Sequence, residues 1–197
     1  MKMCGLLPSA SLTLSNLRGC CFYRFMRPLI FLFCVHLYPS LAFSEAVAPG
    51  ATHFEYGFFC AVETVDTHEA KDTISGVVNL IEGPPPFLKK TTIIPGQLGI
   101  GFGIHVTVNP NFVGQATVVT VHPPMGPDKV IKETWQSEYQ LDNINYNGFT
   151  FEYDYELVFG DWSISAHQDG REIYSVDFQV VDPRFLPPVS CDGGLLS

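Results

Sequence analysis

The sequence predicts an all-β domain, a sandwich or barrel of about eight short strands. Three observations support this prediction. Apolar and polar side chains alternate with a period of two along most of the chain after residue 44, no helical period lasts beyond two turns, and clusters of glycine and proline separate the alternating segments. Residues 45–197 are numerous enough for one domain and few for two.

The first five expected strands are short runs rich in β-branched and aromatic residues, each bounded by turn residues. They cover residues 54–63, 73–81, 98–108, 112–121 and 130–139. The polar stretch 64–72 has too few apolar positions for a buried strand and is expected to be a surface loop.

The clearest alternation covers residues 149–159. Aromatic and aliphatic side chains at odd positions predict a core face, whereas Glu152, Asp154 and Glu156 predict a solvent face. Two last strands, 162–167 and 174–180, form a hairpin around Asp169 and Gly170. The tail, residues 187–197, is expected to be loose except where Cys191 holds it.

The N-terminal region has the three parts of a secretory signal peptide. Residues 26–44 combine Arg27, an apolar run too short to span a bilayer, and the small residues Ala42 and Ser44 before a cleavage site. We expect cleavage after Ser44, a mature domain 45–197, and a periplasmic or secreted location without an integral membrane anchor. Residues 1–25 are interpreted as an unstructured extension or a misplaced start, with Met26 as the alternative start.

Charge and cysteine content narrow the class of protein further. The region 45–197 carries twenty acidic and seven basic side chains, a net charge of −13, which disfavours nucleic acid as a partner. It also contains two of the six cysteines, Cys60 and Cys191. In an oxidising compartment this pair predicts a disulfide between the first strand and the tail.

Two patterns resemble chemical sites. The run Gly99–Gly103 lacks the spacing of a dinucleotide-binding loop, and we interpret it as a strand face approached closely by a backbone or an aromatic ring. His122 and Met125 place an imidazole and a thioether on one turn, as in copper-handling proteins, with His105 as a third candidate ligand. A structural turn is the alternative, and neither a metal nor a cofactor is assigned.

The sequence does not predict an enzyme. It contains neither a Gly-x-Ser-x-Gly nor a Ser-x-x-Lys motif, although a hydrolase triad assembled from distant residues stays open. Trp135, Tyr139 and Tyr146 border a polar stretch and could present a peptide or sugar surface. Trp135 could equally belong to the core.

The last strands carry a family resemblance. Residues 157–164 read LVFGDWSI and are followed by Asp169-Gly170 and by a strand that ends in F-x-V before Pro183, as in the final hairpin of bacterial immunoglobulin-like domains. Together with FEYGFF at 54–59, HPPMGP at 122–127 and ETW at 133–135, the region 52–183 resembles the bacterial domain-of-unknown-function family 3859. Leu157 departs from the phenylalanine of this pattern.

The resemblance implies an immunoglobulin-like β-sandwich in an exported bacterial protein, with no catalytic residues to carry over. The expected function is a non-catalytic module that binds a protein, a glycan or another envelope component. Periplasmic copper handling is the alternative.

Overall fold

A computed structural model describes residues 46–191, which lie within one compact unit, Leu41–Ser197. The described chain forms ten strands and three short 3-10 helices, η1 (Pro110–Phe112), η2 (Asp154–Glu156) and η3 (Pro183–Phe185). This confirms the predicted all-β immunoglobulin-like sandwich. The signal peptide and the extension, residues 1–44, lie outside the described residues. None of the described helices is long and apolar enough to cross a membrane.

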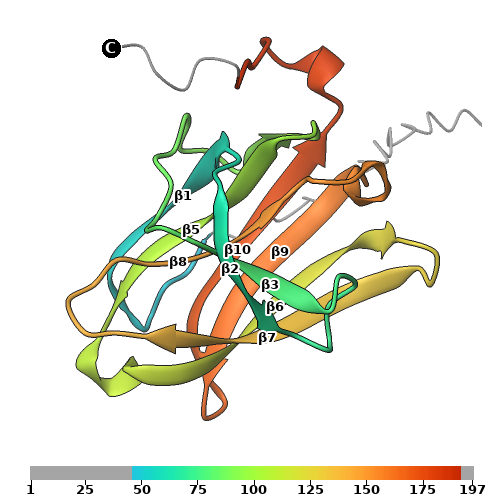
Figure 1. Cartoon of the computed structure of the whole chain (residues 1–197). Helices are drawn as coiled ribbons and strands as arrows, with labels where there is room; N and C mark the ends of the chain where they lie inside the picture. The colour runs from blue at the N-terminus through green and yellow to red at the C-terminus, as the bar shows by residue number, and fades with distance from the viewer. Residues whose placement is uncertain (1–45, 192–197) are drawn as a thin grey trace, which may run out of the picture. The chain divides into compact units, whose positions relative to one another are not determined.

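One layer of the sandwich is a three-stranded antiparallel sheet. It contains β1 (Ala51–Cys60), β5 (Ile100–Val108) and β8 (Asn145–Thr150), in the order β1-β5-β8 (Figure 1). Strand β8 is therefore one edge of this sheet.

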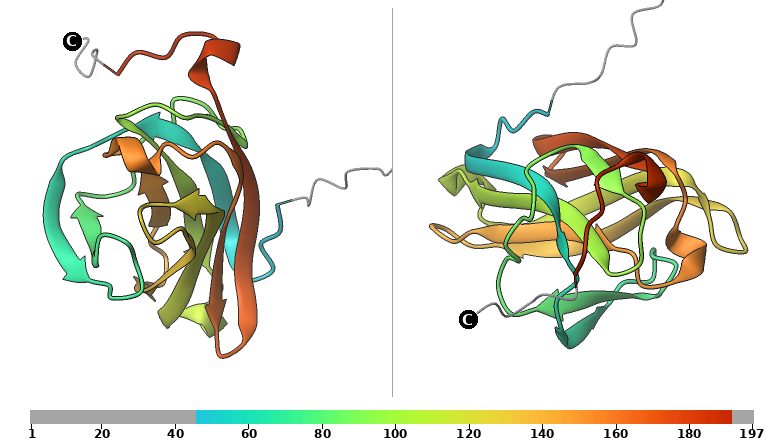
Figure 2. Two further views of the ribbon diagram at one scale, coloured as in Figure 1. Left: turned by 90° about the vertical axis from the view of Figure 1, so that its right-hand side faces the viewer. Right: turned by 90° about the horizontal axis from the view of Figure 1, so that it is seen from above.

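The second layer has five strands. Their order is β4 (Ile93–Pro95), β10 (Arg171–Val181), β9 (Gly160–Gln168), β6 (Gly114–Met125) and β7 (Val130–Tyr139). All pairs are antiparallel except β10 with β4. Strand β7 is an edge of this sheet, and Figure 2 shows the two layers facing each other.

The core between the layers is centred on Phe102 of β5. Its ring centroid lies 5.1 Å from that of Phe178, 5.5 Å from Trp162 and 5.6 Å from Phe151. All four side chains are 2% exposed or less. The aromatic residues that alternate along β5, β9 and β10 thus meet between the sheets, as their spacing predicts.

A buried polar network joins the two sheets near the β7–β8 connection. The Tyr139 hydroxyl donates to the Tyr174 hydroxyl (3.1 Å) and accepts from the Asn147 amide (2.8 Å). Burial raises the pKa of Tyr139 and Tyr174, so both phenols stay neutral. Each polar atom that the core encloses here is therefore paired.

A hairpin outside the two layers replaces the expected surface loop. Residues 64–72 were predicted to be a loop, but β2 (Thr64–Glu69) pairs with β3 (Val77–Ile81) as a separate two-stranded ribbon. Every residue of β2 is exposed, Val65 to 62%. Because neither face of β2 is buried, its sequence carries no alternation of apolar and polar residues.

The predicted strand 149–159 is wrong beyond residue 150. Strand β8 ends at Thr150, and the chain turns through η2 because the Glu156 carboxylate accepts the N–H groups of Glu152 (2.6 Å) and Tyr153 (2.9 Å). The two faces are also reversed at the turn. Glu156 is buried, whereas Tyr153 and Tyr155 are 54% and 40% exposed.

Cys60 and Cys191 form a disulfide, with 5.5 Å between their Cα atoms. It joins the last residue of β1 to the last described residue of the tail. The tail is therefore held to the end of β1 at Cys191, as the sequence predicts.

The glycine-rich strand is β5, and its glycines allow close approach by neighbours. A Cβ atom on Gly101 would lie 2.4 Å from the Phe59 ring, and one on Gly103 would lie 2.4 Å from the Asn147 carbonyl oxygen. The interpretation of the run as a closely approached strand face is confirmed.

Candidate functional site: the cavities beneath the hairpin

The sandwich is open along one side, between the edge strands β7 and β8. The three-stranded sheet stops at β8 and the five-stranded sheet stops at β7, and the described chain supplies no strand between them. The β2–β3 hairpin crosses in front of this gap (Figure 1). Two cavities lie beneath it, each lined by residues of the hairpin and of both edge strands.

The free edge of β7 presents unused backbone groups. The N–H of Thr134 donates to the Asp72 carbonyl at the hairpin turn (3.1 Å), so Thr134 faces away from β6. In an antiparallel ladder, alternate residues direct their N–H and C=O groups to opposite sides. Gln136 and Glu138 therefore also direct their backbone groups toward the open side.

The free edge of β8 also presents unpaired backbone groups. Phe151, directly after β8, donates to the Ile100 carbonyl and accepts from the Gly99 N–H, both on the β5 side. Gly148 and Thr150, at odd separations from Phe151, therefore direct their backbone groups away from β5. Two unpaired strand edges thus border the same opening.

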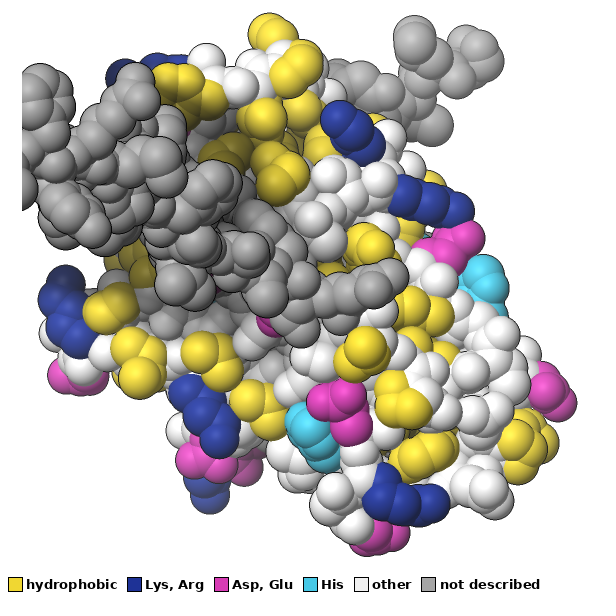
Figure 3. Space-filling view, turned by 180° about the vertical axis from the view of Figure 1, so that it is seen from behind, with side chains coloured by type: hydrophobic (Ala, Val, Ile, Leu, Met, Phe, Trp, Pro, Cys, Tyr) yellow, Lys and Arg dark blue, Asp and Glu magenta, His cyan; other side chains and the backbone are white. Residues whose placement is uncertain are grey.

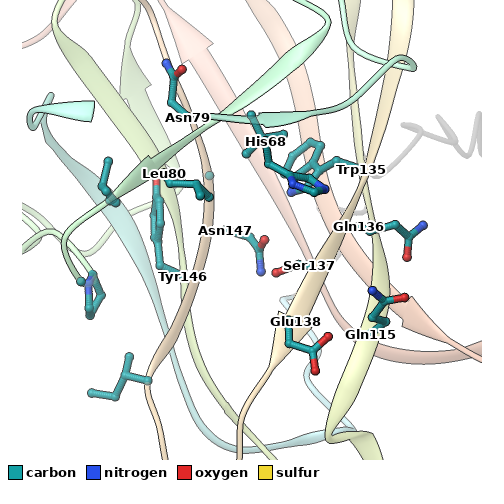
Figure 4. A pocket seen from close by; sticks show the side chains of 16 residues that line it. His68, Asn79, Leu80, Gln115, Trp135, Gln136, Ser137, Glu138, Tyr146 and Asn147 are labelled. Atoms are coloured by element: carbon teal, nitrogen blue, oxygen red, sulfur yellow. The ribbon is translucent and has the colours of Figure 1, made fainter. Parts of the chain in front are cut away.

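The first cavity has a volume of about 470 Å³, within the usual range for ligand sites. Figure 4 shows its labelled side chains, which come from the hairpin (His68, Asn79, Leu80), from β7 (Trp135) and from β8 (Tyr146), together with polar groups on β6, β7 and β8. The half-buried indole and phenol provide apolar surface, and the amide and hydroxyl groups provide hydrogen-bonding partners.

The second cavity adjoins the first and has a volume of about 480 Å³. The two share residues of β3, β7 and β8: Val78, Asn79, Ile81, Trp135, Tyr146 and Gly148. Carboxylates line both cavities, Glu138 the first and Glu133, Glu152 and Glu156 the second, and no lysine or arginine among residues 46–191 lines either one. The opening therefore favours neutral or positively charged ligands.

Three hydrogen bonds hold the hairpin over the opening. Besides the bond from Thr134 to Asp72, the Ile74 N–H donates to Glu133 Oε2 (2.7 Å) and the Asn79 amide donates to Glu152 Oε1 (3.0 Å). The hairpin turn is thereby attached to β7, and β3 is attached to the chain that follows β8.

The candidate metal ligands lie on both sheets, His122 and Met125 on β6 and His105 on β5. His122 on β6 has a fully buried side chain, stacks on Trp162 with ring centroids 4.8 Å apart, and lies 3.3 Å from Glu133 through Nε2. Its Nδ1 lies 2.8 Å from the Pro123 carbonyl, and Met125 is 1% exposed.

His105 lies on the other sheet and stacks on Phe87 with ring centroids 4.1 Å apart. Burial lowers its pKa, with the Glu55 carboxylate acting in the opposite direction. Among residues 46–191, no three His, Cys, Asp or Glu side chains are grouped as metal ligands. Copper handling by His122 and Met125 stays a prediction, and an unchanged melting temperature on adding copper would argue against it.

One serine–histidine pair exists, on β9. Ser165 Oγ lies 3.2 Å from His167 Nε2. Both side chains alternate with the core residues Ile164 and Ala166, so they lie on the outer face of the five-stranded sheet and line neither hairpin cavity. A flat sheet face gives a substrate little surface to bind.

Sequence reasoning found part of this site. It named Trp135 and Tyr146 as surface candidates, and both line the two cavities; Tyr139 is instead fully buried in the core. It did not place His68 and Asn79 in this site, because 64–72 was expected to be a surface loop and 73–81 a strand of the sandwich. The face away from the hairpin (Figure 3) shows hydrophobic side chains interspersed with basic and acidic ones.

Comparison with known proteins identifies the family of this chain. No curated protein matches the chain. One solved structure, an immunoglobulin-like protein from Pseudomonas aeruginosa, aligns with a TM-score of 0.45 and 20% identity, covering 71% of this chain and 99% of that one. The model of the domain of unknown function DUF3859 matches residues 48–180, which include both sheets and the hairpin. The chain belongs to the DUF3859 family, whose domain here is an immunoglobulin-like sandwich with a hairpin over its open side.

Proposed function

We propose that this domain is an exported, non-catalytic binding module that holds an extended polypeptide segment along β7, beneath the β2–β3 hairpin. The observation that carries the proposal is that two unpaired strand edges border one set of cavities. An extended peptide can add to such an edge through its backbone, while cavities on either side accept alternate side chains.

The side chains near the β7 edge suit a peptide. Trp135 and Leu80 offer apolar contact, and Ser137 offers a hydrogen bond to a backbone that is not fully paired. The absence of lysine and arginine from the cavity lining favours a segment with neutral or basic side chains.

Export is supported by the Cys60–Cys191 disulfide, because such bonds persist in oxidising compartments. The non-catalytic assignment is supported by the position of the Ser165–His167 pair on an outer sheet face. The partner is then a polypeptide of the periplasm or of the cell exterior.

The test is a pair of substitutions at Gln136. Because its N–H points away from β6, Gln136→Pro removes an edge donor without breaking the sheet, and Gln136→Ala keeps that donor. Both variants lose the hydrogen bond from the side-chain amide of Gln136 to the Thr117 hydroxyl, so this loss does not distinguish them. Melting curves verify that both variants fold.

A phage library of random linear dodecapeptides is selected on the wild-type domain. The expected result is a set of peptides that bind the wild type and Gln136→Ala equally, and Gln136→Pro at least about tenfold more weakly. The proposal is wrong if no peptide is enriched, if the proline variant binds equally well, or if only a glycan array yields ligands.

A further inference from the structure

We propose that the second cavity binds an organic cation, an ammonium or guanidinium group, between its aromatic side chains and its carboxylates. The lining contains six aromatic residues (Phe59, Trp135, Tyr146, Phe149, Tyr153 and Tyr155) and three glutamates, without lysine, arginine or histidine. This goes beyond the peptide-binding function, because the cation site stands whether or not a polypeptide pairs with β7.

The tyrosine pair of η2 is the most accessible aromatic surface of this cavity. The rings of Tyr153 and Tyr155 are stacked, with centroids 5.5 Å apart and planes 7° apart. They are 54% and 40% exposed. Aromatic rings attract ammonium and guanidinium groups through their negative faces, and aromatic cages recognise such ligands in other proteins.

The carboxylates provide negative charge that no cationic side chain of the lining neutralises. Glu133 has a side chain 7% exposed; its Oε2 accepts the Ile74 N–H, while Oε1 has no hydrogen bond in the described chain and lies 3.3 Å from His122 Nε2 without hydrogen-bond alignment. Glu152, at the exposed side of the cavity, accepts one bond from the Asn79 amide.

Glu156 likewise has no cationic side chain in the cavity lining to balance its charge. Its carboxylate accepts two backbone N–H groups, yet burial raises its pKa, and the nearby Glu152 carboxylate adds to this effect. A cation in the cavity would stabilise the ionised carboxylates. An anion would be repelled by all three, so the charge of the lining selects one class of ligand.

A purely structural role for these residues is the competing explanation, because Glu133 holds the hairpin and Glu156 holds the turn. Such a role accounts for the two carboxylates and for the Tyr155 hydroxyl, which hydrogen-bonds Glu156, but not for the exposed ring faces of Tyr153 and Tyr155. The two explanations differ in whether a free cation binds.

The test titrates the full domain with two cations and with a neutral analogue of each. The probes are choline with 3,3-dimethylbutan-1-ol, and N-acetylarginine amide with N-acetylcitrulline amide. Binding is followed by calorimetry and by amide NMR shifts of Tyr153 and Tyr155. We expect saturable binding of at least one cation and none of its neutral analogue. Tighter binding of choline would identify a quaternary amine as the natural ligand, and tighter binding of N-acetylarginine amide would identify a basic side chain.

Variants locate the site. Glu152→Gln and Tyr155→Leu should each weaken cation binding by about fivefold or more, and Glu172→Gln, which removes the same charge from β10 outside both cavities, should leave it unchanged. Melting curves verify folding. The proposal is overturned if neither cation saturates, if neutral analogues bind equally, or if Glu172→Gln weakens binding as much as Glu152→Gln. Of the two cavities, Gln136 lines only the first. The effect of Gln136→Pro on peptide binding is therefore independent of cation binding in the second cavity.

Discussion

Replacing both disulfide cysteines with serine should remove a large part of the stability of the domain. The bond joins residues separated by 131 positions, from the end of β1 to the tail. Closing so long a loop in the unfolded chain contributes about 5 kcal/mol in the chain-entropy model. Domains of this size have unfolding free energies of roughly 5 to 15 kcal/mol, so the loss is large in proportion.

Urea unfolding followed by tryptophan fluorescence measures this effect. With a slope near 2 kcal/mol per molar urea, a loss of about 5 kcal/mol lowers the midpoint by about 2 to 3 M. Wild-type protein reduced with dithiothreitol is the control and should unfold with the double variant Cys60→Ser/Cys191→Ser. An unchanged midpoint in the double variant would show that the bond does not restrict the unfolded chain in this way.

Three further predictions concern buried groups. Tyr139→Phe leaves the Asn147 amide without its buried acceptor and should lower the unfolding free energy by about 2 kcal/mol, measured in urea; a loss below half of this would contradict the role of the network. Gly101→Ala places a methyl group against the Phe59 ring and should cost about 1 to 3 kcal/mol, and an unchanged melting temperature would refute the close packing. Burial lowers the pKa of His105 in the folded state, so the folded protein favours the neutral imidazole. The stability that the neutral imidazole contributes is therefore fully present above the ordinary pKa of histidine, and it is lost as the pH falls through the lowered pKa of the folded state. His105→Gln should therefore flatten the loss of stability between about pH 7 and pH 5, and an identical pH profile in the variant would contradict this.

The sequence predicted those parts of the fold in which one strand face is buried. Strands β9 and β10 alternate because one face packs into the core and the other does not, whereas β5 is buried on both faces and carries glycine where Phe59 and β8 approach. The strand 149–159 alternates equally well but ends at Thr150, because Glu156 captures two backbone N–H groups. Local alternation carries no information about such a turn.

The candidate site could be predicted only in part, because it results from strand order. Trp135 and Tyr146 were recognisable as aromatics in a polar context, but the opening between β7 and β8 depends on one sheet having fewer strands than the other. That difference arises from pairings across the whole chain. The hairpin that covers the opening has an exposed first strand, so its residues gave no periodic pattern.

The hairpin also has a consequence for how this protein behaves at high concentration. Exposed strand edges template association between copies, and the opposite edges of the two sandwich sheets are protected: Phe58 of β1 exchanges hydrogen bonds with Leu88 and Lys89, and β4 is three residues long and ends in Pro95. In the described part of the chain, only the β2–β3 hairpin covers the free edges of β7 and β8. A shortened chain in which a Gly-Ser link replaces residues 64–81 should assemble into oligomers or fibrils, so the hairpin would protect against aggregation as well as cover a binding site.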